Sequence, residues 1–251
     1  MAVTATQLTS GGSDTNTESY TTASISPSGN KLIIVAVYTR RTAGSTAPTL
    51  TGNGLTYVNF VSETESTGTV LRMTLYRAMG ASPSAGAITI DFGADTMEHC
   101  EWIVTEFDNV DTGGTNGSAA IVQSLGGRDE GTNTGLTITL AAFGDASNAA
   151  YGAVRAGNAI TPGTDFIELA EVTAATEAPN VQAEWKDVAD TTVDWSWAST
   201  GSFAIGAAIE IKAGAASGPA NLKSLNTNAA ANIKSYNSNL IANIKSINTN
   251  A

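Results

Sequence analysis

Apolar residues recur at every second position in short runs through most of the first 212 residues. The segment 70–78 places Leu71, Met73 and Leu75 on one face of a strand, as expected where one face is buried. The segment 31–40 is almost continuously apolar, which is typical of a strand buried on both faces. Gly, Pro, Asn and Asp separate the runs and favour turns. The predicted strands are 31–40, 70–78, 87–92, 98–108, 136–140, 149–155, 166–172, 181–188, 192–198 and 203–212.

This pattern predicts an all-β fold, an antiparallel two-sheet β-sandwich that is jelly-roll-like. No amphipathic helix is predicted before residue 219. The composition changes at Gly214, so we expect a sandwich domain over 1–213, a linker over 214–219 and a tail over 220–251. The tail contains nine Asn and no acidic residue. Three of the 12 basic residues and none of the 23 acidic residues lie in it, so the tail carries +3 and the preceding chain −14.

The tail is an internal repeat, written ANLKSLNTNAA, ANIKSYNSNLI and ANIKSINTNA. Lys223, Lys234 and Lys245 recur every eleven residues. Eleven residues over three helical turns keep an apolar stripe on one face when helices wrap with a right-handed supercoil. A single narrow stripe is buried only against copies of itself or a partner. The apolar positions, spaced by three and four, are Leu222, Leu225, Ala229, Ile233, Tyr236, Leu240, Ile244, Ile247 and Ala251.

Three conformations are open for this repeat. One is a bundle of helices from several chains. Asn, Ser and Thr are poor helix formers, so an extended form intertwined between chains or ordered by a partner is the second. Disorder is the third. The first two imply assembly, and the candidate assembly and anchoring residues are Leu222, Leu225, Ile233, Tyr236, Leu240, Ile244, Ile247, Lys223, Lys234 and Lys245.

Composition narrows the function further. The net charge of −11 disfavours nucleic acid as a partner, because phosphate contacts need clustered Lys and Arg. The longest apolar run, 32–37, is far shorter than a membrane span of about 20 residues. The amino-terminal segment has no signal-peptide pattern, so folding in a cytoplasm-like compartment is expected. One Cys and one His leave no disulfide framework and no multi-His metal site. We expect no enzyme activity, no cofactor and no metal.

The remaining candidate groups have ordinary interpretations beside the functional ones. His99 lies in a predicted strand and is expected to be a packed or edge residue, and Cys100 is expected to face the core with Trp102 and Val104. Asp108 and Asp111 are expected to flank a turn. Two further acidic groups are expected, Asp129 with Glu130 in a Gly-rich loop and Asp187, Asp190 and Asp194 around a hairpin. These acids are either solvated or hold a structural calcium ion, although none follows the calcium-loop spacing.

Three tryptophans carry the alternative function. Trp195 and Trp197 are two residues apart and share a strand face, and Trp185 lies a similar distance before the predicted turn. If the two strands pair across a hairpin, the indoles form an aromatic ladder. If the indoles face inward, they are part of the hydrophobic core. If they face outward, they form a platform on which the sugar rings of a host glycan could stack.

The order of segments in the body resembles a β-sandwich module of phage and bacterial surface proteins. The segments that carry the resemblance are KLIIVAVYTR, TLTGNGLTYVNF, LRMTLYRAMGASPSAGAITIDF, WIVTEFDNVD and VDWSWASTGSFAIGAAIEIK, within residues 20–212. The tail is similar to the NIKSIN-type repeats that close many phage virion proteins, with Thr or Ser in place of the usual Gly after Asn226, Asn237 and Asn248. The module has no agreed enzymatic role and implies no catalytic residues.

The resemblance implies a structural protein of a tailed-phage virion. The expected role is a capsid decoration, cement or head-fibre protein that forms homo-oligomers, with three chains favoured, and binds other virion proteins of the capsid, neck or tail through its repeats. Its expected location is the particle surface after assembly in the host cytoplasm. The alternative is a glycan-binding host-adhesion module on a tail or fibre.

Overall fold

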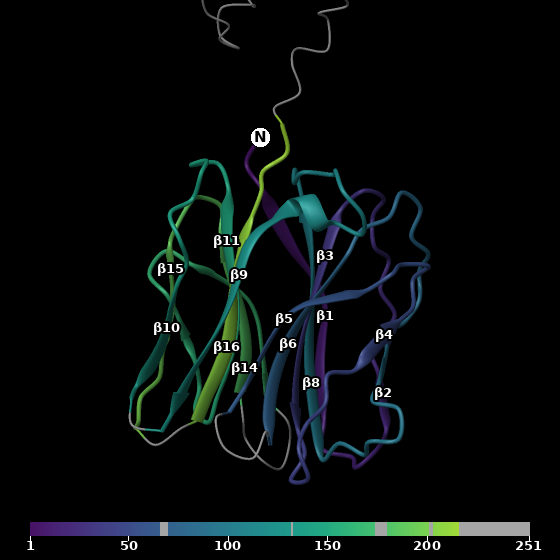
Figure 1. Ribbon diagram of the computed structural model, residues 1–251, viewed down its shortest axis with the longest axis vertical. Coiled ribbons are helices and arrows are strands. Elements are labelled where there is room, and N and C mark those ends of the chain that lie inside the picture. The colour runs from purple at the N-terminus through teal and green to yellow at the C-terminus, as the bar shows by residue number, and fades with distance from the viewer. Residues whose placement is uncertain (66–69, 132, 174–179, 201–202, 216–251) are drawn as a thin grey trace, which may run out of the picture. The chain divides into compact units, whose positions relative to one another are not determined.

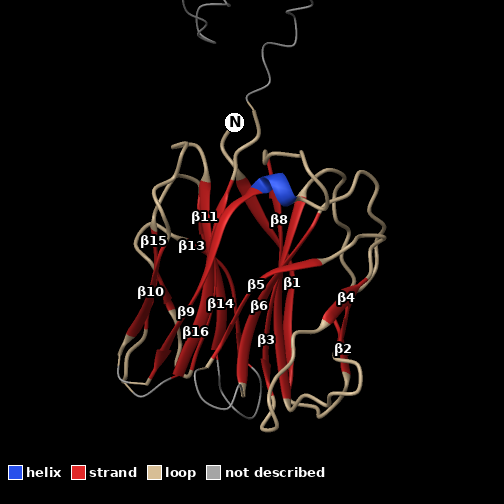
Figure 2. Ribbon diagram, viewed as in Figure 1, coloured by secondary structure: helices blue, strands red, loops and turns tan. Residues whose placement is uncertain are grey.

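The computed structural model describes residues 1–65, 70–131, 133–173, 180–200 and 203–215, and one compact unit spans Ala2–Gly214. The all-β antiparallel sandwich is confirmed (Figure 2). The only helical element in the described part of the chain is the 3-10 turn Ser118–Ala120. The strands are β1 (Thr4–Ser13), β2 (Ser19–Thr21), β3 (Leu32–Arg40), β4 (Thr49–Thr51), β5 (Val58–Thr64), β6 (Leu71–Ala78), β7 (Thr89–Asp91), β8 (His99–Asp108), β9 (Ile121–Glu130), β10 (Gly135–Thr139), β11 (Ala149–Ala156), β12 (Thr161–Pro162), β13 (Ile167–Thr173), β14 (Asn180–Lys186), β15 (Thr192–Ser196) and β16 (Phe203–Ile211).

The described residues of the body form four stacked sheets. Two five-stranded sheets, in the orders β1-β8-β3-β6-β5 and β13-β14-β11-β16-β9, pack face to face at the centre (Figure 1). A three-stranded sheet lies outside each of them, β2-β7-β4 on the first and β10-β15-β12 on the second. The predicted sandwich is therefore the central pair of layers, and an additional small sheet covers each outer face.

The chain contains the same strand topology twice. Adding eight to each strand number of the first large sheet gives β9-β16-β11-β14-β13, which is the second large sheet read from its other edge. The same operation converts β2-β7-β4 into β10-β15-β12. Within each half, strands one, eight, three and six share a sheet, as in a jelly roll, and the fifth strand joins the sixth. We call β1–β8 the first half and β9–β16 the second half.

An approximate two-fold axis between the large sheets relates the halves. β1 contacts β13 and β5 contacts β9, so each half places its first strand against the fifth strand of the other. The eighth strands behave alike, since β8 contacts β13 and β14 while β16 contacts β5 and β6. Contacts that occur in such reciprocal pairs define an isologous interface, the arrangement of a symmetric dimer formed here within one chain.

The core has three parts that follow these layers. The central core between the large sheets includes Leu32, Ile103, Phe107, Tyr151 and Trp185. Each small sheet closes an outer core against its own large sheet. The strand 70–78 shows the consequence, because its apolar face enters the central core while the other face, with Thr74 and Tyr76, is also buried.

Candidate functional site

The residues expected to mediate assembly, from Leu222 to Ile247 with the three repeat lysines, lie outside the described residues. The structure describes the place where the chain leaves the body. The Gly214 N–H donates a hydrogen bond to the Asn109 carbonyl over 2.7 Å, and Val110 and Ala213 form an antiparallel bridge. The Asn109 side-chain amide donates to the Ala2 carbonyl over 2.9 Å. Asn109 therefore contacts both ends of the compact unit, at the end where β8 and β16 finish.

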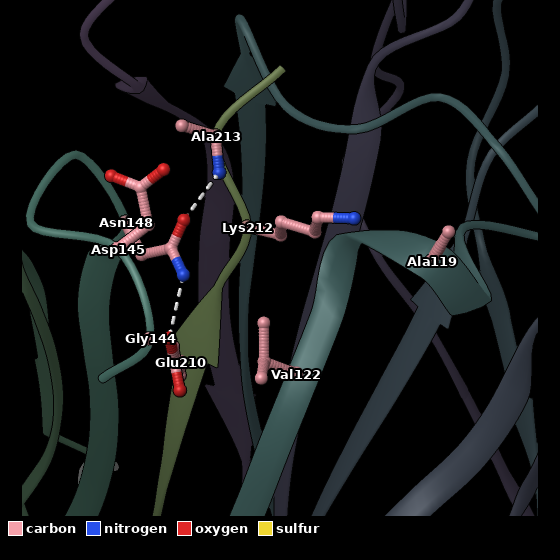
Figure 3. A pocket seen from close by; sticks show the side chains of 8 residues that line it. All are labelled: Ala119, Val122, Gly144, Asp145, Asn148, Glu210, Lys212 and Ala213. Atoms are coloured by element: carbon pink, nitrogen blue, oxygen red, sulfur yellow. Dashed lines mark hydrogen bonds between the residues drawn. The ribbon is translucent and has the colours of Figure 1, made fainter. Parts of the chain in front are cut away.

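A cavity of about 460 Å³ opens beside this junction (Figure 3). Its floor is Glu210, which is fully buried on β16. The side-chain amides of Asn148 and Gln123 each donate to one Glu210 carboxylate oxygen over 2.6 Å. The residues that line the cavity are Ala119, Val122, Gly144, Asp145, Asn148, Glu210, Lys212 and Ala213.

The first half explains what the Glu210 carboxylate does. Its counterpart is Glu106, because Glu106 lies one residue before the last core residue of β8, as Glu210 does on β16. The Glu106 carboxylate accepts a hydrogen bond from the Ser28 N–H over 2.6 Å. Ser28 precedes the third strand, and so does Asn148 in the second half. In both halves this carboxylate fastens the segment before the third strand to the last strand, so its role is to hold the fold.

The condition for an aromatic ladder, pairing of the two strands across a hairpin, is not met. Trp185 on β14 pairs with Tyr151 and Ile167 in the large sheet, whereas Trp195 on β15 belongs to the small sheet. The segment between them crosses from one layer to the next and does not form a hairpin, although the sequence pattern of two strands and a short turn is the same. Trp185, Trp195 and Trp197 are 8%, 2% and 4% exposed. The inward alternative holds, and these indoles present no stacking platform on the surface.

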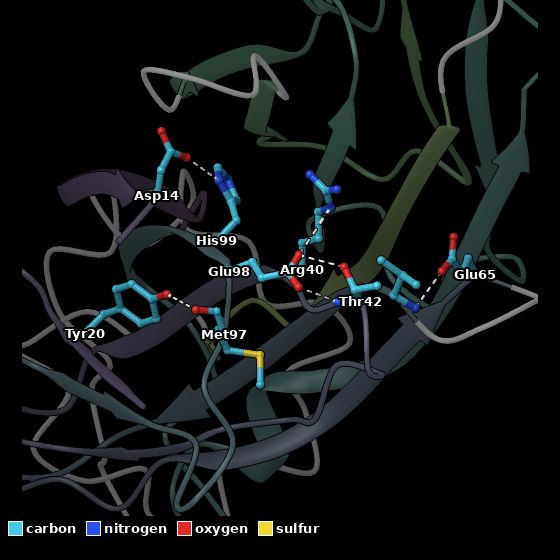
Figure 4. Close-up of polar contacts among 9 residues, drawn as sticks. Asp14, Tyr20, Arg40, Thr42, Glu65, Met97, Glu98 and His99 are labelled. Atoms are coloured by element: carbon cyan, nitrogen blue, oxygen red, sulfur yellow. Dashed lines mark hydrogen bonds and ion pairs between the residues drawn. The ribbon is translucent and has the colours of Figure 1, made fainter. Parts of the chain in front are cut away.

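The single histidine is buried in a polar cluster (Figure 4). His99 Nδ1 lies 2.6 Å from Asp14 Oδ1, and Nε2 lies 3.4 Å from Glu101 Oε2. Glu101 faces the central core, where Arg155 of the second half places its guanidinium 5.5 Å from the centre of the Tyr38 ring. Tyr38 also packs edge-on against the His99 ring, so the Arg155 guanidinium links the second half to this cluster.

Neighbouring contacts in Figure 4 anchor the start of β8. The Glu98 carboxylate accepts the Thr42 N–H and hydroxyl, each over 3.0 Å, and these bonds hold the pKa of Glu98 below its usual value. The Tyr20 hydroxyl donates to the Met97 carbonyl over 3.1 Å. Cys100 is fully buried, as expected, and burial raises the pKa of its thiol well above the usual value. A thiol in this state is a packing group and a poor nucleophile.

The acidic groups singled out in the sequence are distributed over separate places. Asp108 pairs with Lys31, and Asp111 pairs with Lys212 over 2.7 Å. Asp129 and Glu130 lie at the end of β9, so their assignment to a loop is wrong. The strand continues because Phe203 and Ala204 on β16 pair with these two residues. Asp190 pairs with Lys186 over 2.9 Å. Within the described residues, no three His, Cys, Asp or Glu side chains lie together so as to hold a metal ion.

Sequence reasoning missed one unusual group, Glu184. It is fully buried on β14, between the second large sheet and its small sheet. Burial raises the pKa of this carboxyl to about 8, Asp194 and Glu168 add to the rise, and a hydrogen bond from the Gly163 N–H opposes it. The available signal was the pair Gln182 and Glu184 alternating with Val181, Ala183 and Trp185. Such alternation is typical of a solvated face, and the small sheet covers this one.

Comparisons with protein families, curated proteins and solved structures found no match. In the described part of the chain, no helix is long and apolar enough to cross a membrane.

Proposed function

We propose that this protein is a structural component of a tailed-phage virion, a capsid decoration, cement or head-fibre protein. Its double-sandwich body is displayed on the particle, and its carboxyl-terminal repeat joins three chains and binds them to other virion proteins. The observation that carries the proposal is the repeat itself, three copies at a spacing of eleven residues with an apolar stripe. The resemblance of this repeat to the repeats of phage virion proteins is the reason for proposing a virion as the assembly.

The edges of the body support an assembly role for the tail. Each edge strand of the two large sheets has an irregular register, in β1 at Gln7/Thr9, in β5 at Asn59/Val61, in β13 at Glu168/Ala170, and in β9 opposite Glu210/Ile211. The central pairs of β3 and β11 with their neighbours have none. Bulged edges disfavour the addition of a strand from another chain. The body is thus protected against association through the edges of its two large sheets.

Charge supports the same division of roles. The body carries all 23 acidic residues, and like charge between bodies keeps them apart at close spacing. The tail carries +3 and its Asn side chains both donate and accept hydrogen bonds. A cationic, amide-rich segment attached to an acidic body favours association through the segment.

Sedimentation of the full chain tests the assembly part of the proposal. We expect the mass of a trimer for the wild type and a monomer for the double variant I233D/I244D, because charges in the stripe cannot be buried without partners. S235D/S246D is the matched control with the same added charge. In a helix these serines lie opposite the stripe, so the control should remain trimeric. In an extended form they share its face, so the control should dissociate too.

A wild-type monomer at micromolar concentration would contradict assembly. An I233D/I244D variant that sediments like the wild type would also contradict it, because the stripe would then not form the interface. Circular dichroism of each variant shows whether the body keeps its β spectrum, which separates lost assembly from lost folding.

A further inference from the structure

Two residues of β14 fasten one external segment to the second large sheet. Glu184 Oε2 accepts the Gly163 N–H over 3.0 Å. Two residues later, Lys186 Nζ donates to the Thr164 carbonyl over 3.4 Å. The segment 157–166 includes β12, which pairs with β15 through Pro162 and Trp195. Fastening this segment therefore also holds one edge of the small sheet.

Among the residues that the structure describes, the surroundings of Glu184 contain carboxylates and no cation that balances it. Its cross-strand neighbours are Gly152 on β11 and Glu168 on β13, and Asp194 approaches from β15. Glu171 on β13 accepts the Ile160 N–H over 3.0 Å. The cation on the same strand, Lys186, is engaged by Asp190 at 2.9 Å and by Asp165 at 3.8 Å.

One oxygen of Glu184 is left without a partner. Glu184 Oε1 is buried and has no hydrogen bond within the described residues. The amide nitrogen of Gln182, the polar neighbour on the same face, is taken by the Ile160 carbonyl at 3.2 Å and by Glu168 at 3.1 Å. A carboxylate in this position is buried beside Glu168 and Asp194 and lacks a counter-charge among the described residues, so the closed arrangement favours the neutral acid.

The first half carries the same connection without a carboxyl group. Tyr76 on β6 occupies the position in the first half that Glu184 occupies in the second. The second residue of β3, like that of β11, pairs with a residue on the neighbouring strand, and Tyr76 and Glu184 each lie two residues before that residue. Both side chains face the small sheet of their own half. The Tyr76 hydroxyl donates to the Pro48 carbonyl over 2.5 Å, next to β4, the counterpart of β12. Only the second half makes this connection with a group that titrates near neutral pH.

We propose that Glu184 is a proton-operated latch, which in its neutral form keeps the segment 157–166 and the edge of the small sheet closed on the second half. Loss of the proton leaves a buried anion beside Glu168 and Asp194, and this anion gains hydration only when the segment lifts. The latch therefore loosens as pH rises. The first half, with Tyr76 in the same place, stays closed.

Hydrogen exchange of the full-length protein tests the latch. The measured quantity is the exchange rate of amides in 157–166 in the wild type divided by that in E184Q, at each pH. The division cancels the intrinsic pH dependence of exchange. Glu184 has a pKa near 8 when the segment is closed and an ordinary pKa when the segment is open. The ratio of exchange rates should therefore rise on the order of 50-fold between pH 6 and pH 8 and level off at higher pH. Y76F is the matched control. The ratio of amide exchange rates in β4 between the wild type and Y76F should not change with pH.

Equal pH trends in the wild type and E184Q would overturn the proposal. So would a rise shared by amides of β3 and β6, because the opening would then involve the whole body. Should E184Q fail to fold, carbon NMR of wild-type carboxyl groups still decides. The latch requires one buried glutamate whose pKa lies well above the usual range. The exchange rates of the amides in 157–166 must change over the same pH range in which this glutamate titrates. Titration of every glutamate in the usual range contradicts it.

Discussion

The two halves share one topology, but their large sheets contribute residues of different size to the outer cores. In the first half, the large sheet supplies bulky residues such as Val35 and Trp102, and the small sheet adds Ile90. In the second half, the large sheet supplies Ala150, Ala204 and Ala208, and the bulk comes from the small sheet. The comparison teaches that a matched position can hold a large residue in one half and a small one in the other when the facing layer fills the space.

The matched pairs Val35 with Ile90 and Gly152 with Trp195 show this exchange most clearly. Val35 and Gly152 occupy the fourth position of β3 and β11, and Ile90 and Trp195 are central in the small sheets. A Cβ at Gly152 would lie 2.5 Å from Cζ2 of Trp195, so the indole occupies the space of the missing side chain. A large residue on one layer requires a small one opposite, because interiors are close-packed.

The largest expected effect comes from exchanging these volumes. G152V should destabilise the body by about 3 kcal/mol or more through overlap with Trp195 and Val193, and W195I by about 2–4 kcal/mol through the space left behind. The double variant G152V/W195I imitates the first half, so its loss should fall short of the sum of the single losses by at least about 1 kcal/mol. Denaturant unfolding measures all three. G152V combined with I90V in the other half is the control, and its losses should add.

The pH dependence of stability is the second difference between the halves. The pKa of Glu184 is about 8 in the folded chain, above its ordinary value, so the folded state holds this proton more tightly. Its contribution is complete below about pH 4.5 and is lost as pH rises to about 8. Relative to E184Q, the wild type should lose about 2–4 kcal/mol of unfolding free energy between pH 5 and pH 8. Chemical denaturation at a series of pH values measures this difference, and a constant difference would refute the buried neutral acid.

The smallest expected effect concerns the junction between the halves. Hydrogen bonds from Lys212 and from the Gly113 N–H hold the pKa of Asp111 below its usual value. This depressed pKa contributes stability above the ordinary pKa of Asp, and the contribution is lost as pH falls through the folded value. Because the pair is partly exposed, D111N should cost less than about 1 kcal/mol at pH 7, and the cost should shrink in molar salt. A double-mutant cycle with K212Q measures the pair, and a coupling that does not respond to salt would contradict this account.

The sequence predicted the fold class and the central strands well. The segments 31–40, 98–108 and 149–155 match β3, β8 and β11, because strands in the middle of a sheet carry long apolar runs. The strands that escaped prediction are at edges or very short. β1 and β9 are largely polar, since much of an edge strand faces water, and β2 and β4 contain three residues each. Runs of this kind are difficult to distinguish from loops.

The duplication and the latch could not be predicted for a common reason. Matched positions hold unlike residues, such as Tyr38 and Arg155 or Tyr76 and Glu184, and only their direction toward a layer is shared. Residue patterns alone carry no trace of such a repeat. They also do not show that a second sheet covers a face that looks solvated, so nothing in the sequence singled out Glu184. Trp195 and Trp197 are buried in the core that this layer closes, whereas Trp185 faces the central core.

A reconstruction of the virion tests the central claim most directly, because it places the body and the repeat in one density map. The account predicts three double-sandwich bodies around a local three-fold axis, with density that continues from Gly214 of each body into one shared element bound to another virion protein. Bodies that occur singly on the particle, with no density joining them beyond Gly214, would contradict assembly through the repeat, and a mature particle without the protein would contradict the structural role.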